Sequence, residues 1–258
     1  MPRAAFFTQI SMLKYHKFIS FCIGLAFLIV LQRFATPEPV FRFLLPAFLV
    51  YAAAASLYNR WYLKKIGQYN FWLLLRILLL LSAAFGIFLI VPSDFLRGLF
   101  LIVAVVLITF FEIILGNLSE NILLNETLII AFGLFFTLTA FYEYVPSYAT
   151  AYLVGAFLGA ALLARSLYEF VPQPKPVKLI GAVTLGLFVS EVFWALNFLP
   201  FHFSVAALLL FNLFYLCLIL NYYYLFHILS FQKIQFHLVL IAACDAAVLL
   251  VTRWRILS

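Results

Sequence analysis

Residues 71–91 read FWLLLRILLLLSAAFGIFLIV and contain a single charged residue, Arg76. A mostly apolar stretch of about 20 residues can cross the hydrocarbon core of a bilayer as an α-helix. Strands of a membrane barrel would alternate apolar and polar side chains, whereas residues 77–81 are continuously apolar. The segment therefore predicts a transmembrane helix.

The rest of the chain has the same apolar character. Hydrophobic residues make up 67% of its 258 residues and charged residues only 10%, whereas a soluble domain is about half apolar and about a quarter charged. A folded chain of this size still exposes much of its surface, so folding alone cannot hide this excess from water. We therefore expect a lipid bilayer to surround the protein.

Eight further segments of similar composition predict an all-α polytopic bundle of about nine spans. The spans are expected near residues 18–32, 40–57, 71–91, 95–115, 127–142, 148–167, 179–199, 203–226 and 236–251. The connections are too short to fold as soluble domains, so residues 1–258 are expected to form a single membrane domain. No small-x-small cleavage site follows the first span, which favours a retained signal anchor.

The Lys and Arg residues indicate how the chain is oriented. If the N-terminus is cytoplasmic, most of them fall in inner segments, as the positive-inside rule requires. Two segments oppose this orientation, the acidic residues 117–126 and the basic residues 253–255. Because the basic residues flank spans, the net charge of +7 does not indicate nucleic-acid binding. A cell membrane with the N-terminus inside is the expected location.

Polar side chains within the spans are the first candidates for function. Glu191, Asn212 and Asp245 lie in the seventh, eighth and ninth predicted spans, at broadly similar depth. Ionisable groups are costly in lipid and often mark ion or substrate pathways. Consecutive helices joined by short loops are often neighbours, which predicts a polar site near the membrane midplane. The alternative is that these groups only hydrogen-bond between helices and hold the bundle together.

A second candidate is the connection between the fourth and fifth predicted spans. Its acidic and amide residues, which could bind a hard cation, are Glu112, Asn117, Glu120, Asn121 and Glu126. The segment lacks the Asp/Glu spacing of a calcium loop. A solvated connection without a ligand is therefore the alternative interpretation.

Small residues at a spacing of four indicate close helix packing. Gly155 and Gly159 form such a pair in the sixth span, and Ala182 and Gly186 form another in the seventh. Small residues let helix backbones approach closely in membranes. We expect these two helices to contact each other within one chain, and a homo-oligomer seam is the alternative.

Sequence motifs do not assign an activity. The chain contains no HExxH, CxxC, GxSxG, Walker or GxGxxG motif, so no catalytic residue, metal ligand or cofactor is predicted. Three functions stay open. The first is a transporter-like or ion-coupled protein with a midplane site, although no internal repeat is evident. The others are a non-catalytic assembly subunit, with protein partners undetermined, and a membrane enzyme acting on a lipid-linked substrate.

One stretch resembles a known group of proteins. Residues 191–201, EVFWALNFLPF, are followed by a Tyr-rich helix, and this pattern resembles the C-terminal part of multi-pass membrane proteins of candidate-phylum bacteria. The resemblance covers about the last third of the chain. It implies a bacterial inner membrane and no particular activity.

Overall fold

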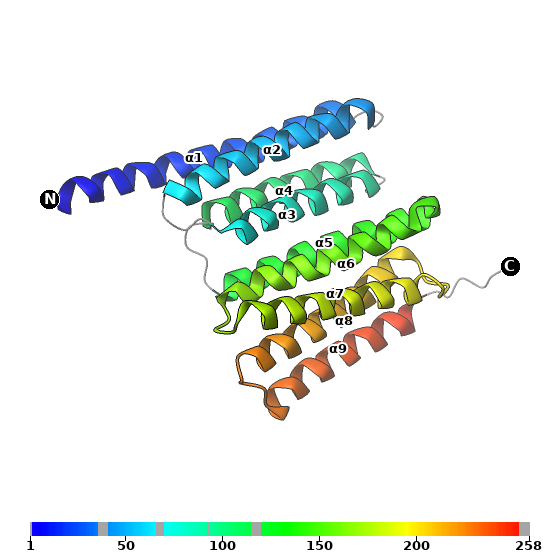
Figure 1. Ribbon diagram of the computed structural model, residues 1–258. Helices are drawn as coiled ribbons and strands as arrows, with labels where there is room; N and C mark the ends of the chain where they lie inside the picture. Colours follow the sequence, from blue (N-terminus) through cyan, green and yellow to red (C-terminus); the bar gives the residue numbers. More distant parts are fainter. Residues whose placement is uncertain (1, 36–40, 66–69, 92, 115–119, 253–258) are drawn as a thin grey trace. The chain divides into compact units, whose positions relative to one another are not determined.

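The computed structural model describes residues 2–35, 41–65, 70–91, 93–114 and 120–252, all of them in helices or short connections, without β-strands. It excludes the side chains of residues 2–14, 33–35, 41–45, 120, 121, 233 and 251. The α-helices of this described part are α1 (Pro2–Ala35), α2 (Phe41–Lys65), α3 (Phe71–Ile90), α4 (Asp94–Ile114), α5 (Glu120–Tyr144), α6 (Ala149–Leu167), α7 (Lys175–Leu196), α8 (Phe203–Leu225) and α9 (Phe231–Val251) (Figure 1). The expected all-α bundle is confirmed.

The helices have the length and composition of membrane spans. Seven of them, within the described residues, are long and apolar enough to cross a bilayer, and α9 contributes a shorter apolar stretch, Ile234–Leu250. Large apolar side chains such as Ile102, Val106 and Leu250 are exposed. Water would not stabilise so much exposed apolar surface, whereas lipid does. The chain is a multi-pass membrane protein.

The chain divides into two compact units, and the first, unit 1, covers Met1–Ser119. Its four helices pack in a closed order, because α1 contacts α2 and α4, and α3 contacts the same two helices. Phe27, Leu81 and Ile108 are fully or almost fully buried. Short connections make consecutive helices antiparallel neighbours.

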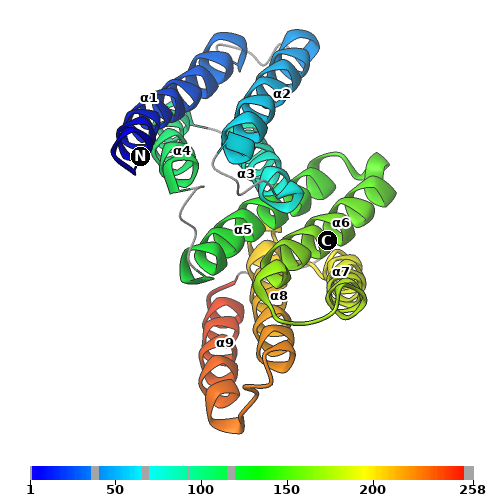
Figure 2. The ribbon, with the colours of Figure 1, turned by 60° about the vertical axis from the view of Figure 1, so that its left-hand side comes forward.

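Unit 2 covers Glu120–Ser258. Helices α5, α6, α7 and α8 also pack in a closed order, with α5 against α8, and α9 packs on α8. Figure 2 shows α9 beside α8, at the edge of this group. Phe135, Phe193 and Phe214 are fully buried within the unit.

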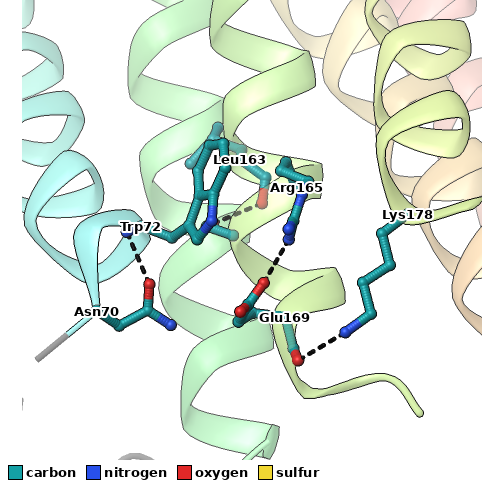
Figure 3. Close-up of polar contacts among 7 residues, drawn as sticks. Asn70, Trp72, Leu163, Arg165, Glu169 and Lys178 are labelled. Atoms are coloured by element: carbon teal, nitrogen blue, oxygen red, sulfur yellow. Dashed lines mark hydrogen bonds and ion pairs between the residues drawn. The ribbon is translucent and has the colours of Figure 1, made fainter. Parts of the chain in front are cut away.

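Local polar contacts fix several helix ends. The side chain of Asn70 caps α3 by accepting a hydrogen bond from the backbone N–H of Trp72 at 2.9 Å, which satisfies one of the first N–H groups of the helix. Between α6 and α7, Arg165 pairs with the Glu169 carboxylate at 2.6 Å, and the Lys178 ammonium donates to the Glu169 carbonyl oxygen at 3.0 Å (Figure 3). These contacts hold the turn between α6 and α7.

The small residues lie at helix contacts, but they face two different neighbours. A Cβ atom on Gly186 would lie 2.8 Å from the Phe157 carbonyl oxygen of α6, so α7 approaches α6 closely there. A Cβ on Gly155 or Gly159 would instead meet leucines of α5, Leu138 and Leu134. The two helices contact each other within one chain, as expected. The glycines of α6 instead receive leucines of α5, because α6 is packed on two sides.

Candidate functional site

Two of the three predicted midplane residues form a hydrogen bond. The Nδ2 of Asn212 on α8 donates to Oδ1 of Asp245 on α9 at 2.6 Å. Asn212 is 8% exposed, and Asp245 is partly exposed. A short bond from an amide to a carboxyl group is a strong interaction where water is excluded. Asp245 therefore has a fixed polar partner on the neighbouring helix.

Nearer the turn between the same two helices, His237 of α9 bridges two tyrosines of α8. The Tyr215 hydroxyl lies 2.7 Å from Nδ1, and the Tyr223 hydroxyl lies 3.2 Å from Nε2. In a neutral imidazole one ring nitrogen donates and the other accepts. One tyrosine therefore accepts a hydrogen from the ring while the other donates to it.

These contacts form a continuous seam between α8 and α9, which we call the α8–α9 seam. On α9 it consists of His237, Ile241 and Asp245, whose spacing of four places them on one helical face. Ile241 is buried, whereas most other side chains of α9 are exposed. His237, Ile241 and Asp245 therefore form the face of α9 that packs on α8.

The third predicted residue, Glu191, lies in a different environment. Its side chain is exposed and lines a groove between α6 and α7 together with Phe157, Leu187 and Trp194. The groove is mostly apolar, and Ser190 is its other polar residue. The geometry thus groups Asn212 with Asp245 and places Glu191 beside α6 instead.

The predicted cation-binding connection is mostly helix. Glu112 belongs to α4, where it is 1% exposed, and its Oε1 accepts a hydrogen bond from Nδ2 of Asn59 at 2.7 Å. Glu126 is buried in α5. Glu112 is therefore part of unit 1, and Glu126 is part of unit 2. Asn117 and the side chains of Glu120 and Asn121 lie outside the described residues, and within the described part no cluster of three or more metal-ligating side chains occurs.

Sequence reasoning missed a polar cluster in unit 1. His16 of α1 is 1% exposed. Its Nδ1 lies 2.9 Å from the Tyr58 hydroxyl and its Nε2 lies 2.8 Å from the Glu112 carbonyl oxygen. The carbonyl can only accept, so Nε2 carries a hydrogen and, in the neutral ring, Tyr58 donates to Nδ1.

Aromatic rings complete this cluster. The His16 ring stacks on Tyr62, with centroids 3.5 Å apart, and Asn59 is fully buried beside Glu112. The partners of His16 come from α2 and α4, many residues away, so no local pattern could identify them.

Comparisons with protein-family models, with curated proteins and with solved structures find no match. The geometry of the two units is therefore the basis for a functional proposal.

Proposed function

We propose that the chain is a proton-coupled membrane transporter and that Asp245 holds the coupling proton. The supporting observation is the α8–α9 seam, in which a bridging histidine precedes a hydrogen-bonded carboxyl. Histidine and carboxyl groups are the side chains that pumps and carriers use to relay protons.

The depth of the seam supports a path from one surface to the midplane. Tyr223 lies near the end of α8 at Leu225, within a group of tyrosines typical of the headgroup region. Asn212 is eleven residues earlier, and a rise of about 1.5 Å per residue places it about 16 Å deeper. This is about half of a hydrocarbon core of about 30 Å.

Each polar group in the seam has a role in the proposed relay. His237 can take a proton on one ring nitrogen and release another from the opposite nitrogen, because both nitrogens contact a hydroxyl. Ile241 separates His237 from Asp245 on α9, so a proton needs a bridging water to pass between them. Asn212 donates to Asp245 and orients its carboxyl group.

The residues that follow the seam on the far side of Asn212 and Asp245 favour a carrier over an open channel. Beyond Asn212 toward the start of α8, residues 205–211 read VAALLLF, and beyond Asp245 residues 246–251 read AAVLLV. An apolar stretch of this kind offers a proton no hydrogen-bonding partner. Protons would therefore reach Asp245 from one side only, and release to the other side requires a conformational change, as in alternating access.

The charge distribution and the sequence resemblance extend the proposal to location. The bias of Lys and Arg places the N-terminus in the cytoplasm, which puts Tyr223 on the cytoplasmic side. The resemblance of residues 191–201 to membrane proteins of candidate-phylum bacteria supports a bacterial inner membrane.

Proton flux in vesicles tests the proposal. The purified full chain is reconstituted into vesicles holding a pH-sensitive dye, and the decay of an imposed pH gradient is followed with the membrane potential clamped. Wild-type vesicles should lose the gradient faster than protein-free vesicles. Asp245→Asn should remove this excess, because the amide keeps a partner for Asn212 but holds no exchangeable acid proton.

Glu191→Gln is the matched control, since it also neutralises a carboxyl on a membrane helix but lies outside the seam. Its flux should equal that of the wild type. The proposal fails if wild-type vesicles decay like protein-free ones, or if Asp245→Asn behaves like Glu191→Gln.

A further inference from the structure

We propose that α1 and α2 bind a membrane lipid with an anionic phosphate headgroup, with the headgroup beside His16 and one acyl chain between the two helices. This inference concerns unit 1 and is independent of the α8–α9 seam. It rests on two adjoining cavities, one lined by aromatic residues and a lysine and the other mostly by small and apolar residues.

The first cavity, here named the headgroup pocket, is polar and aromatic. Its main lining residues are Tyr15, His16, Tyr58, Trp61, Tyr62 and Lys65. Tyrosine and tryptophan rings carry both apolar and polar atoms, and they prefer the depth of lipid headgroups. Lys65 supplies a cation there, and it ends α2 beside Lys64. The acidic group nearest this cluster, Glu112, is buried beneath it and accepts from Asn59.

The second cavity, here named the chain groove, continues from the first along α1 and α2. Ile19 and Tyr58 line both cavities. Its other walls are formed by small or apolar side chains and one tyrosine, namely Cys22, Ile23, Ala26, Tyr51, Ala54 and Ala55. From Ile19 to Ala26 the groove follows seven residues of α1, a length of about 10 Å at the helical rise. An apolar groove of this length fits part of an acyl chain.

The headgroup pocket is held in a fixed shape. The His16 ring is clamped by hydrogen bonds at both nitrogens, 2.9 Å from the Tyr58 hydroxyl and 2.8 Å from the Glu112 carbonyl oxygen, and it stacks on Tyr62. The Tyr51 hydroxyl donates to the Ile23 carbonyl oxygen at 3.0 Å and fixes the groove wall. A preformed site loses less conformational freedom when a ligand binds.

The charge of the pocket selects an anion. Aromatic rings alone would also suit a quaternary ammonium group. However, the Lys65 ammonium lies over the Trp61 ring, 4.8 Å from its centroid, and already places a positive charge at that ring. Lys17, which follows His16 in α1, is exposed and adds a second cation at this level of the helix, outside the pocket lining. A phosphate group is the headgroup chemistry that complements these charges.

Native mass spectrometry of the full chain in detergent tests the proposal, with phosphatidylglycerol as the probe and phosphatidylcholine of the same chain length for comparison. Wild-type protein should bind phosphatidylglycerol more tightly than phosphatidylcholine. Lys65→Gln should weaken phosphatidylglycerol binding about fivefold, the effect of one lysine near a lipid phosphate. Lys175→Gln, an exposed lysine at the start of α7, should not change it.

A second pair of variants tests the groove. Ala54→Phe fills it and should reduce phosphatidylglycerol binding, whereas Ala53→Phe, at a neighbouring exposed position outside the groove, should leave binding unchanged. Equal binding of the two lipids, or equal effects of Lys65→Gln and Lys175→Gln, would overturn the proposal. Binding of inorganic phosphate that competes with phosphatidylglycerol, together with no effect of Ala54→Phe, would show a phosphate site and also overturn it.

Discussion

Some buried polar side chains of this protein are paired between helices distant in sequence. Asn59 of α2 is fully buried and donates to Glu112 of α4 at 2.7 Å. Removing one partner of a buried hydrogen bond leaves the other without its interaction, and this costs more than the net gain from the bond itself. Such pairs therefore contribute strongly to the stability of unit 1.

Asn59→Ala should lower the free energy of unfolding by about 1–3 kcal/mol, because the buried carboxylate of Glu112 loses its amide donor. The measurement is unfolding by detergent titration, followed by circular dichroism. Asn125→Ala is the control, since Asn125 is exposed on α5, and it should change stability little. Equal losses in the two variants would contradict the role given to Asn59.

At the scale of whole helices, close approach depends on small residues. Helix association in lipid relies on packing contacts because lipid chains are as apolar as the side chains they would replace. Gly186 allows α7 to lie against the backbone of α6, and Gly159 receives Leu134 of α5. Helix α6 therefore makes close contacts on two sides. A glycine of α7 allows the contact with α7, and a glycine of α6 itself allows the contact with α5.

Gly186→Ala should destabilise the protein by about 1–3 kcal/mol, since overpacking a tight contact forces backbone shifts. The added Cβ would lie 2.8 Å from the Phe157 carbonyl oxygen and 2.9 Å from the Cβ of Ala161. Gly98→Ala on α4 is the control, because its Cβ would meet nothing within 4 Å. The thermal unfolding midpoint of Gly98→Ala should stay constant or rise. If its midpoint fell as much as that of Gly186→Ala, the packing explanation would be excluded.

At the scale of the whole molecule, the first four helices of each unit contact one another in the same order. Helices α1–α4 close into a ring of contacts, and α5–α8 do the same, while α9 packs on α8 without a counterpart in unit 1. Many transporters contain two units of similar topology. This organisation supports the proposed transport function, although no internal repeat is evident in the sequence.

With the N-terminus inside, as proposed, nine crossings would place each connection on a defined side of the membrane. Ser93 and Ser147 follow the third and fifth helices and should lie outside, whereas Ser230 follows the eighth and should lie inside; all three residues are exposed. Each is changed to Cys after Cys22, Cys217 and Cys244 are replaced by Ala. A membrane-impermeant maleimide added to intact cells should label positions 93 and 147 only. Labelling of position 230 under these conditions would mean that a helix before it does not cross.

The helices could be predicted closely because their signal is local. The span expected at residues 71–91 corresponds to α3 (Phe71–Ile90), and that expected at 203–226 corresponds to α8 (Phe203–Leu225). Each boundary is marked by a cap or a change in composition, such as Asn70 before α3. The cation-binding connection stays a prediction, because Asn117 and the side chains of Glu120 and Asn121 lie outside the described residues; Glu112 and Glu126 belong to helices α4 and α5.

The sequence by itself determined that this chain forms apolar helices in lipid, because about twenty consecutive residues are enough to specify a span. Only the tertiary structure decided that Asp245 meets Asn212, that Glu191 faces a separate groove, and that His16 joins Tyr58 and Glu112. The physical reason is that a helix apolar all round carries no contrast to mark its buried face. Its rotation, and therefore which side chains meet, is set by packing against neighbouring helices.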